Sequence, residues 1–295
     1  MGKEIPMNFE AFVNDITDNK WNVFGTEVYK ENELIHTWGD TYGLHEIYSA
    51  TKTVLSIAVG MAYDEGLIDL NRSVLDYLPK KETSLANDKQ LELFKNINIE
   101  RLLTMSVCGF EFRAEGDNWL EFALNSQVEP DRKEFNYSNI SAYLAGVCLT
   151  HAIGCDLGEF IEKRLFKPLN IENYEYGRSP EGYFYGASAM KLSVHDLSKI
   201  GILLYNGGAF DGKRIVSKEY VDLATSVRVM NREGGYGYFI WKYRNGFSIN
   251  GKLKQKCYVL KDEGLIVTYL SHIEDESHDL LKSMEKNILQ IRAEG

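Results

Sequence analysis

Apolar and polar positions alternate near both ends of the chain. Residues 21–38 alternate as strand residues do on either side of Glu31-Asn32-Glu33, a pattern typical of a β-hairpin. Toward the C-terminus, the polar segment 261–264 has the composition of a turn between two strands. Runs with strand character precede and follow this turn: 237–243, 246–249, 255–260 and 265–271.

The middle of the chain has helical periodicity instead. From Ala50 to Leu67 the apolar residues recur at helical spacing, and Gly66 stands near the end, so we expect a mostly buried helix with a glycine stop. The same reasoning predicts further helices over 101–105, 119–126, 138–153, 156–166, 194–205, 217–227 and 279–292.

Strands at both ends and helices between them predict an α/β (α+β) fold. One antiparallel sheet is built from both chain ends and flanked by helices, with an all-helical lobe inserted. We expect the sheet domain to comprise residues 1–66 and 185–295, and the helical domain 67–184. The two form a single functional unit, and its site is expected at the cleft between them.

The charge composition makes some classes of binding partner less favourable than others. The 295 residues include 33 Lys and Arg against 43 Asp and Glu, which gives a formal net charge of −10. Such a charge disfavours nucleic acid and anionic membranes as partners. We therefore expect a small-molecule or peptide substrate, while the oligomeric state stays open. The chain has neither a long apolar run nor a secretory signal, so the expected location is cytoplasmic.

Several cofactor motifs are missing. There is no GxGxxG after a strand and no GxxxxGK[ST], so nucleotide binding has no support. There is no GxSxG and no HExxH, and the spacing of His272 and His278 matches no zinc template. The four cysteines form no CxxC pair and are interpreted as reduced, mostly buried residues. No cofactor and no metal are expected.

The most informative element is Ser49-Ala50-Thr51-Lys52. Residues three apart on a helix share a face, so Ser49 and Lys52 would lie together. A serine that opens a helix has unpaired first-turn amides beside it, which can help to hold an oxyanion. A lysine buried beneath it would have a lowered pKa and could accept the serine proton.

The Ser-x-x-Lys spacing alone is common, because this chain contains it three times. The copy at Ser283/Lys286 lies in a charged terminal helix, where a solvated face explains it. The copy at Ser188/Lys191 has no long apolar helix behind it. Only Ser49 stands at the head of such a helix, and this context favours it as the nucleophile.

A second element is Tyr-x-Asn at 137–139. The Tyr137 phenol could pass the serine proton to a leaving group, and the Asn139 amide could orient Lys52 or a substrate carbonyl. The same spacing recurs at 243–245, and an ordinary loop tyrosine is the alternative interpretation of Tyr137.

The segments 48–53, 66–70 and 74–79 together resemble the serine β-lactamase-related family. That family includes class C β-lactamases, DD-peptidases, D-aminopeptidases, family VIII esterases and nylon-oligomer hydrolases. The resemblance covers about residues 20 to 272. Further stretches agree in the right order: 99–106, 135–139, 167–169, 186–188, 195–197 and 206–208.

The resemblance implies a serine hydrolase of the esterase, amidase or peptidase type. Ser49 would be the acylated nucleophile, Lys52 its activator and Tyr137 the general acid/base, while Asn139 would position the substrate. The oxyanion would rest on the amide of Ser49 and on one amide from a facing strand, near Lys252.

One family motif is altered. The family has Lys-Thr-Gly or His-x-Gly on the facing strand, and the nearest match here is Ile249-Asn250-Gly251. Lys252 could supply the missing charge, or it could be an exposed strand-turn lysine. We therefore take Asn250, Gly251 and Lys252 as candidate substrate-binding residues. The change argues against a carboxylate-bearing β-lactam or D-Ala-D-Ala peptide as substrate.

Two other positions have open interpretations. Cys108, which follows the helix leading to the site, either lines the pocket or is a small buried residue. The aromatic run 183–185 either lines a pocket for an apolar acyl group or is ordinary packing. At the level of function, the alternative to a hydrolase is a catalytically weak or inactive penicillin-binding-protein-like protein that binds a ligand.

Overall fold

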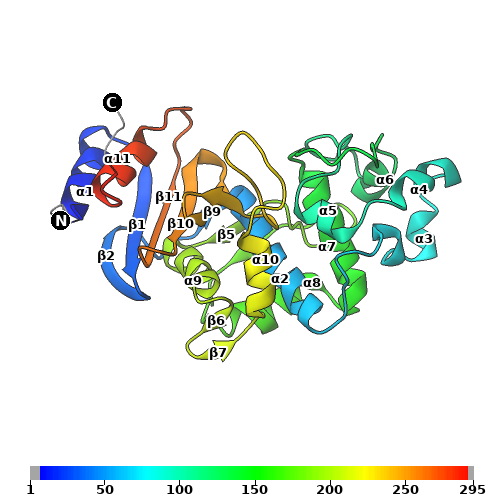
Figure 1. Cartoon of the computed structure of the whole chain (residues 1–295), viewed down its shortest axis with the longest axis horizontal. Helices are drawn as coiled ribbons and strands as arrows, with labels where there is room; N and C mark the ends of the chain where they lie inside the picture. The colour runs from blue at the N-terminus through cyan, green and yellow to red at the C-terminus, as the bar shows by residue number, and fades with distance from the viewer. Residues whose placement is uncertain (1–6, 292–295) are drawn as a thin grey trace.

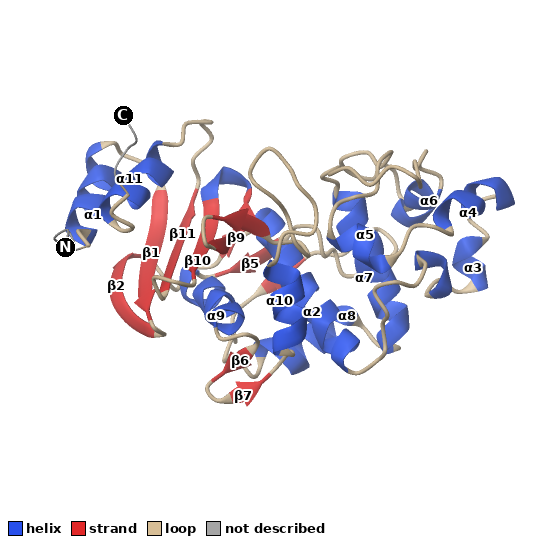
Figure 2. Cartoon of the chain, viewed as in Figure 1, coloured by secondary structure: helices blue, strands red, loops and turns tan. Residues whose placement is uncertain are grey.

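A six-stranded antiparallel sheet forms one half of the molecule (Figures 1 and 2). The computed structural model describes residues 7–291. The helix predicted over 279–292 ends earlier than expected, at Asn287, and residue 292 lies outside the described residues. The strand order is β2-β1-β11-β10-β9-β8. These strands are β1 (Val23–Lys30), β2 (Glu33–Gly39), β8 (Trp241–Tyr243), β9 (Gly246–Gly251), β10 (Gln255–Leu260) and β11 (Leu265–Ser271).

The sheet joins the two ends of the chain. Strands β1 and β2 form the predicted hairpin, and its turn residues Glu31 and Asn32 both have positive φ, as a tight two-residue hairpin turn requires. Strand β1 then pairs with β11, with Val28 opposite Val267. The prediction of one antiparallel sheet from both chain ends is confirmed.

Helices cover both faces of this sheet. On one face α1 (Phe9–Asp18) and α11 (Asp279–Asn287) pack together, joined by the Asp15 carboxylate, which accepts hydrogen bonds from Ser283 and Asn287. The opposite face packs against α9 (Val194–Tyr205). Helix α1 was missing from the sequence prediction.

The other half of the molecule is helical (Figure 1, right). Helix α2 (Thr51–Asp64) packs against α7 (Asn139–Ile153), and both are buried along most of their length. This burial on all sides agrees with their nearly continuous apolar sequences. The shorter helices are α3 (Lys80–Thr83), α4 (Asp88–Phe94), α5 (Ile99–Leu103), α6 (Trp119–Leu124), α8 (Leu157–Ile161) and α10 (Lys218–Thr225).

Small strands complete the fold. A three-stranded sheet has the order β3-β5-β4, and β6 pairs with β7 in a separate hairpin. Their bounds are β3 (His45–Glu46), β4 (Glu175–Tyr176), β5 (Met190–Leu192), β6 (Ala209–Phe210) and β7 (Lys213–Arg214). Strand β5 lies directly before α9 and pairs with β3, which ends just before Ser49.

Two other predicted elements also differ from the structure in the residues that they span. The strand expected over 237–243 is confined to β8, because Phe239 has a φ of +57° and turns the chain just before it. The helix expected over 156–166 changes after Ile161 into a π-helical turn over 162–166. Three of the cysteines are buried as expected, but Cys155 is exposed.

Within the described residues, no single helix is long and apolar enough to cross a membrane. The helices at 139–153 and 157–166 meet the length and hydropathy criteria only when taken together, and they are bent by 78° at the break between them.

Candidate active site

Ser49 lies at a strained point of the backbone. It is the central residue of a 3-10 turn over Tyr48–Ala50 that leads directly into α2. The preceding residue, Tyr48, has a φ of +48°, which is unfavourable for a side chain of this size. The segment is held from the other side by a hydrogen bond from the Ile47 amide to the Met190 carbonyl (2.9 Å). The Ser49 side chain is half-buried, so a ligand can reach it.

Lys52 lies one helical turn after Ser49 and is almost completely buried, with 1% of its surface exposed. Its Nζ contacts three oxygens: Ser49 Oγ at 3.1 Å, Asn139 Oδ1 at 2.8 Å and the Ala187 carbonyl at 2.7 Å. The predicted pair of Ser49 and Lys52 is thus within hydrogen-bond distance, and Asn139 joins it from the start of α7.

Burial lowers the pKa of Lys52 to about 7, because the charged ammonium is costly in a site that is out of contact with water. No carboxylate hydrogen-bonds to Nζ to oppose this effect among the described residues. A large fraction of the amines is therefore uncharged near neutral pH.

The three partners fit an uncharged amine. A neutral amine has two N–H donors and one lone pair, and the oxygens of Asn139 and Ala187 can only accept hydrogen bonds. The third partner, Ser49, has a hydroxyl that can donate. The orientation of the Asn139 amide is consistent, because its other end faces the Tyr185 hydroxyl and lowers the pKa of that group, against the larger effect of burial. The Ser49 hydroxyl can thus point its proton at Nζ.

Tyr137 lies across from this pair. Lys52 Nζ is 5.0 Å from the centroid of its ring. Burial raises the pKa of the Tyr137 hydroxyl to about 12, and a hydrogen bond to Ser49 opposes part of the rise. The ring packs against both Phe135 and Trp241, with centroids 6.2 and 5.6 Å away, and these two rings also contact each other. Tyr137 thus stays protonated at neutral pH, beside both Ser49 and Lys52.

The loop that carries Tyr137 is fixed by hydrogen bonds to the preceding loop. The Asn136 amide donates to the Met105 carbonyl (2.6 Å), and its side chain donates to the carbonyls of Val107 and Phe110. Ser138 caps α7 by accepting from the Ile140 amide. Hydrogen bonds of the two adjacent residues, Asn136 and Ser138, therefore hold the backbone on both sides of Tyr137.

The segment 249–252 borders Ser49 from the sheet. A Cβ at Gly251 would lie 2.2 Å from the Ile47 carbonyl oxygen, so the end of β9 touches the segment just before the serine. Asn250 has a buried Oδ1 without a hydrogen-bond partner among the described residues. Ile249 is fully buried and Lys252 is exposed. The roles expected for Asn250, Gly251 and Lys252 in binding substrate stay predictions.

The other two Ser-x-x-Lys copies have different surroundings. Lys191 forms an ion pair with Glu175 across the small sheet. Ser283 is buried and hydrogen-bonds to Asp15 between the two helices at the chain ends. No hydrogen bond joins the serine and lysine of either copy within residues 7–291, in contrast to the pair in α2.

Ser49, Lys52, Tyr137 and Asn139 together form the Ser49 cluster. Two cavities lie near it. One, of about 420 Å³, is bordered by Asn139 and by the aromatic side chains of Trp119, Tyr143 and Tyr185. The other, of about 650 Å³, is lined by Phe135 and Trp241 among others, and the Tyr137 ring packs against both of these side chains. One cavity thus lies beside Asn139, and the other lies beside the aromatic neighbours of Tyr137. Cys108 lines neither cavity and is buried, with its Sγ beside the Glu134 carbonyl (3.6 Å).

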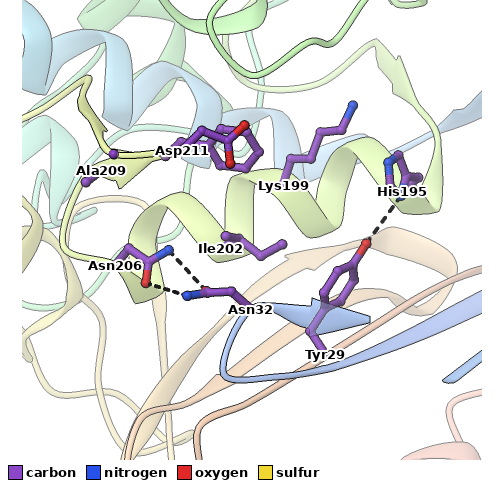
Figure 3. Close-up of a pocket in the computed structure, with 10 residues that line it drawn as sticks. Tyr29, Asn32, His195, Lys199, Ile202, Asn206, Ala209 and Asp211 are labelled. Carbon is purple, nitrogen blue, oxygen red and sulfur yellow. Dashed lines mark hydrogen bonds between the residues drawn. The ribbon is translucent and has the colours of Figure 1, made fainter. Parts of the chain in front are cut away.

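A third cavity, of about 570 Å³, lies between the β1–β2 hairpin and α9 (Figure 3). In it, Tyr29 and His195 point toward each other, and both contact the buried Glu27 carboxylate at 2.9 and 3.1 Å. Asn32 and Asn206 form a reciprocal amide pair. None of the residues that line it belongs to the Ser49 cluster, so we do not regard it as the reaction site.

Sequence reasoning missed several neighbours of the cluster. Ala187 contributes only its backbone oxygen, which no side-chain pattern reveals; the segment 186–188 was noted for its family resemblance alone. Gly186 allows this approach, since a Cβ there would lie 2.5 Å from Leu55 of α2. Of the aromatic run 183–185, Tyr185 lines the smaller cavity, whereas Phe184 belongs to the core. Trp241 gave no signal in the sequence.

A sequence model of the family described as "Beta-lactamase" matches residues 33–287, which is most of the chain. The chain belongs to the beta-lactamase family. The expected resemblance and the expected fold are therefore confirmed. Within the described residues, no group of three or more His, Cys, Asp or Glu side chains is arranged to hold a metal ion.

One relative of this beta-lactamase-family chain is a named hydrolase. A 6-aminohexanoate-dimer hydrolase of Paenarthrobacter ureafaciens is 22% identical over 194 residues, which cover 60% of this chain and 50% of that protein. The match thus spans about half the length of this curated relative.

Two solved structures have the same fold. A family VIII carboxylesterase superposes with a TM-score of 0.76 at 17% identity, over 98% of this chain and 99% of the other. A D-stereospecific amidohydrolase from Streptomyces sp. superposes with a TM-score of 0.72 at 18% identity, over 97% and 100%. At these identities the likeness shows the fold alone.

Proposed function

We propose that the protein is a serine hydrolase that forms an acyl-enzyme on Ser49 with an amide or ester substrate. The observation that carries the proposal is the set of three contacts made by the buried Lys52 amine, two with obligate acceptors and one with the Ser49 hydroxyl. A lysine that only stabilised the fold would be expected to have a carboxylate partner or to reach solvent.

The first half of the reaction forms the acyl-enzyme. Ser49 Oγ attacks the substrate carbonyl carbon as its proton moves to Lys52 Nζ. The resulting oxyanion is held by backbone amides, those of Ser49 and Lys252 in our proposal. As the C–N or C–O bond breaks, the Tyr137 hydroxyl gives its proton to the leaving group and takes one from Lys52.

The second half releases the acyl group. A water molecule replaces the leaving group and attacks the acyl carbonyl, giving its proton back through Tyr137 and Lys52 to Ser49 Oγ. The products are a carboxylic acid and an amine or alcohol, and the enzyme is regenerated without a cofactor. Asn139 keeps the Lys52 amine in place throughout through its Oδ1 contact.

The decisive experiment is the mass of the intact protein after incubation with a penicillin and, separately, with a p-nitrophenyl ester. A mass gain or ester turnover in the wild type, absent in Ser49→Ala and retained in Ser188→Ala, is the expected result. The linear dimer of 6-aminohexanoate is a third substrate to try, given the curated relative. Equal modification of the wild type and Ser49→Ala would contradict the proposal.

A protein that binds a ligand without turnover is the second candidate. One observation favours it: Ile249 is uncharged and buried at the position where the family motif has a cation. Saturable ligand binding that is unchanged in Ser49→Ala, with no adduct in any sample, would support this candidate instead.

A further inference from the structure

The two cavities beside Ser49 have different chemical roles if the proposed function holds, and this inference rests on it. Tyr137 protonates the leaving group, so the leaving group lies on its side, in the cavity lined by Phe135 and Trp241. The acyl group then occupies the 420 Å³ cavity, which is bordered by Asn139, a direct hydrogen-bond partner of Lys52.

The 420 Å³ cavity, called the acyl-side cavity below, combines aromatic walls with the cationic side chain of Arg113. Trp119 packs edge-on against Tyr143 and Tyr185, with centroids 5.8 and 5.0 Å away, which gives the cavity rigid apolar sides. Arg113 lines the same cavity and is exposed. Burial raises the pKa of the Tyr185 hydroxyl in the same cavity, and the positive charge of Arg113 opposes part of that rise.

Arg113 is unusual among the arginines of this protein. Ten arginines lie within residues 7–291, and eight of them make hydrogen bonds to carboxylates or carbonyls. Only Arg113 and Arg232 make none in that range, and each lines one of the two cavities beside Tyr137. A guanidinium left free at the mouth of a pocket is suited to a planar anion such as a carboxylate.

We propose that Arg113 binds a carboxylate at the far end of a short acyl group, so that the preferred substrates are monoesters or monoamides of small dicarboxylic acids. The apolar part of the acyl chain lies against Trp119 and Tyr185. Glu115 also lines this cavity, and no hydrogen bond or ion pair joins it to Arg113 within the described residues. Its charge therefore weakens the binding of an anion without blocking Arg113.

The test measures binding in the Ser49→Ala protein, so that it does not depend on turnover. Calorimetry compares the monoanilide of glutaric acid with pentananilide, which has the same chain length and no carboxylate. We expect the anionic probe to bind about three- to tenfold more tightly at low salt, as a partly exposed ion pair allows. Arg113→Gln should abolish that preference, and Arg113→Lys should keep part of it.

Matched variants and a third probe sharpen the test. Arg232→Gln, which removes the other free arginine, should leave the preference unchanged, and Glu115→Gln should increase it. A probe with its carboxylate on the leaving-group side, 4-(pentanoylamino)benzoate, should be insensitive to Arg113→Gln. Equal affinity for the first two probes, or a preference that survives Arg113→Gln, would overturn the inference. Failure of acylation at Ser49 would overturn the proposed function and with it the preferred substrates, whereas an anionic preference lost only in Arg113→Gln would still identify Arg113 as the carboxylate-binding residue.

Discussion

The candidate site has a helical wall, formed by α2 and the start of α7, and a strand wall, formed by residues 249–252. The two walls differ in how completely their polar groups are hydrogen-bonded. On the helical wall, Lys52 contacts three oxygens, one of which is Asn139 Oδ1. On the strand wall, Asn250 Oδ1 is buried without a hydrogen-bond partner among the described residues, and Lys252 is exposed. The Lys52 amine of the helical wall thus has all its hydrogen-bond partners within the protein. We infer that the strand wall obtains its missing partners from the substrate.

The comparison predicts that the largest losses come from the helical wall. Lys52→Ala should lower the rate of acylation by roughly 10³-fold or more, because no other described base contacts Ser49 Oγ. Rapid-quench mass spectrometry measures the rate, and a melting curve tests the fold. Lys191→Ala, in another Ser-x-x-Lys copy, is the matched control. Near-normal turnover in Lys52→Ala with an unchanged melting curve would contradict the mechanism.

Tyr137→Phe should have the next largest effect, a loss of roughly 10²-fold in kcat, because it removes the proton donor and keeps the ring against Phe135 and Trp241. Steady-state kinetics with a good and a poor leaving group measure it. The loss should be larger for the poor leaving group, which needs the proton more. An equal loss for both would assign Tyr137 a positioning role.

Gly251→Ala tests the contact between the two walls. A Cβ there would lie 2.2 Å from the Ile47 carbonyl, so strand β9 must move away from the serine. We expect the free energy of unfolding to fall by about 1–3 kcal/mol and kcat/KM to fall roughly tenfold. Chemical denaturation and ester kinetics measure the two effects. Gly146→Ala in α7 is the control, because neither glycine has a positive φ and a Cβ at Gly146 would meet only ordinary contacts, the nearest at 3.6 Å.

The pH dependence follows from the lowered pKa of Lys52, about 7. The neutral amine is the base, so falling pH protonates it and removes activity. We expect kcat/KM to be nearly constant above pH 8 and to fall about tenfold per pH unit well below pH 7. A pH profile of ester hydrolysis in the wild type measures this. A flat profile between pH 5 and 8 would show that Lys52 is not the base.

The smallest effect is expected at Lys252, whose side chain is exposed. If it contributes only its backbone amide to the oxyanion, Lys252→Gln should change kcat/KM by less than about threefold. Kinetics with a neutral and an anionic ester measure this. A selective loss for the anionic ester would show instead that the Lys252 side chain supplies the charge missing from position 249.

The distance in sequence between contacting residues explains which parts of the site could be predicted from sequence. Ser49 and Lys52 are one helical turn apart, so local geometry alone predicts their contact, and the apolar run behind them predicts the burial. The contact with Asn139 needed the family resemblance, since 87 residues separate it from Lys52. The Ala187 carbonyl leaves no pattern, because every residue has one. Helix α1 was missed although its apolar residues Phe12 and Ile16 are one helical turn apart, and these residues pack on the sheet as well as on α11.

The pairing of β1 with β11 has a consequence for how the protein is made. Ser49 and Lys52 leave the ribosome early, but β1 has no partner on that side until β11 is synthesised, and β9 must also arrive to reach Ile47. The sheet therefore forms late, from contacts distant in sequence, which is slow and leaves apolar strand surface exposed in the meantime. A nascent chain that stops before residue 265 holds every proposed proton-transfer group and still cannot close the site around them.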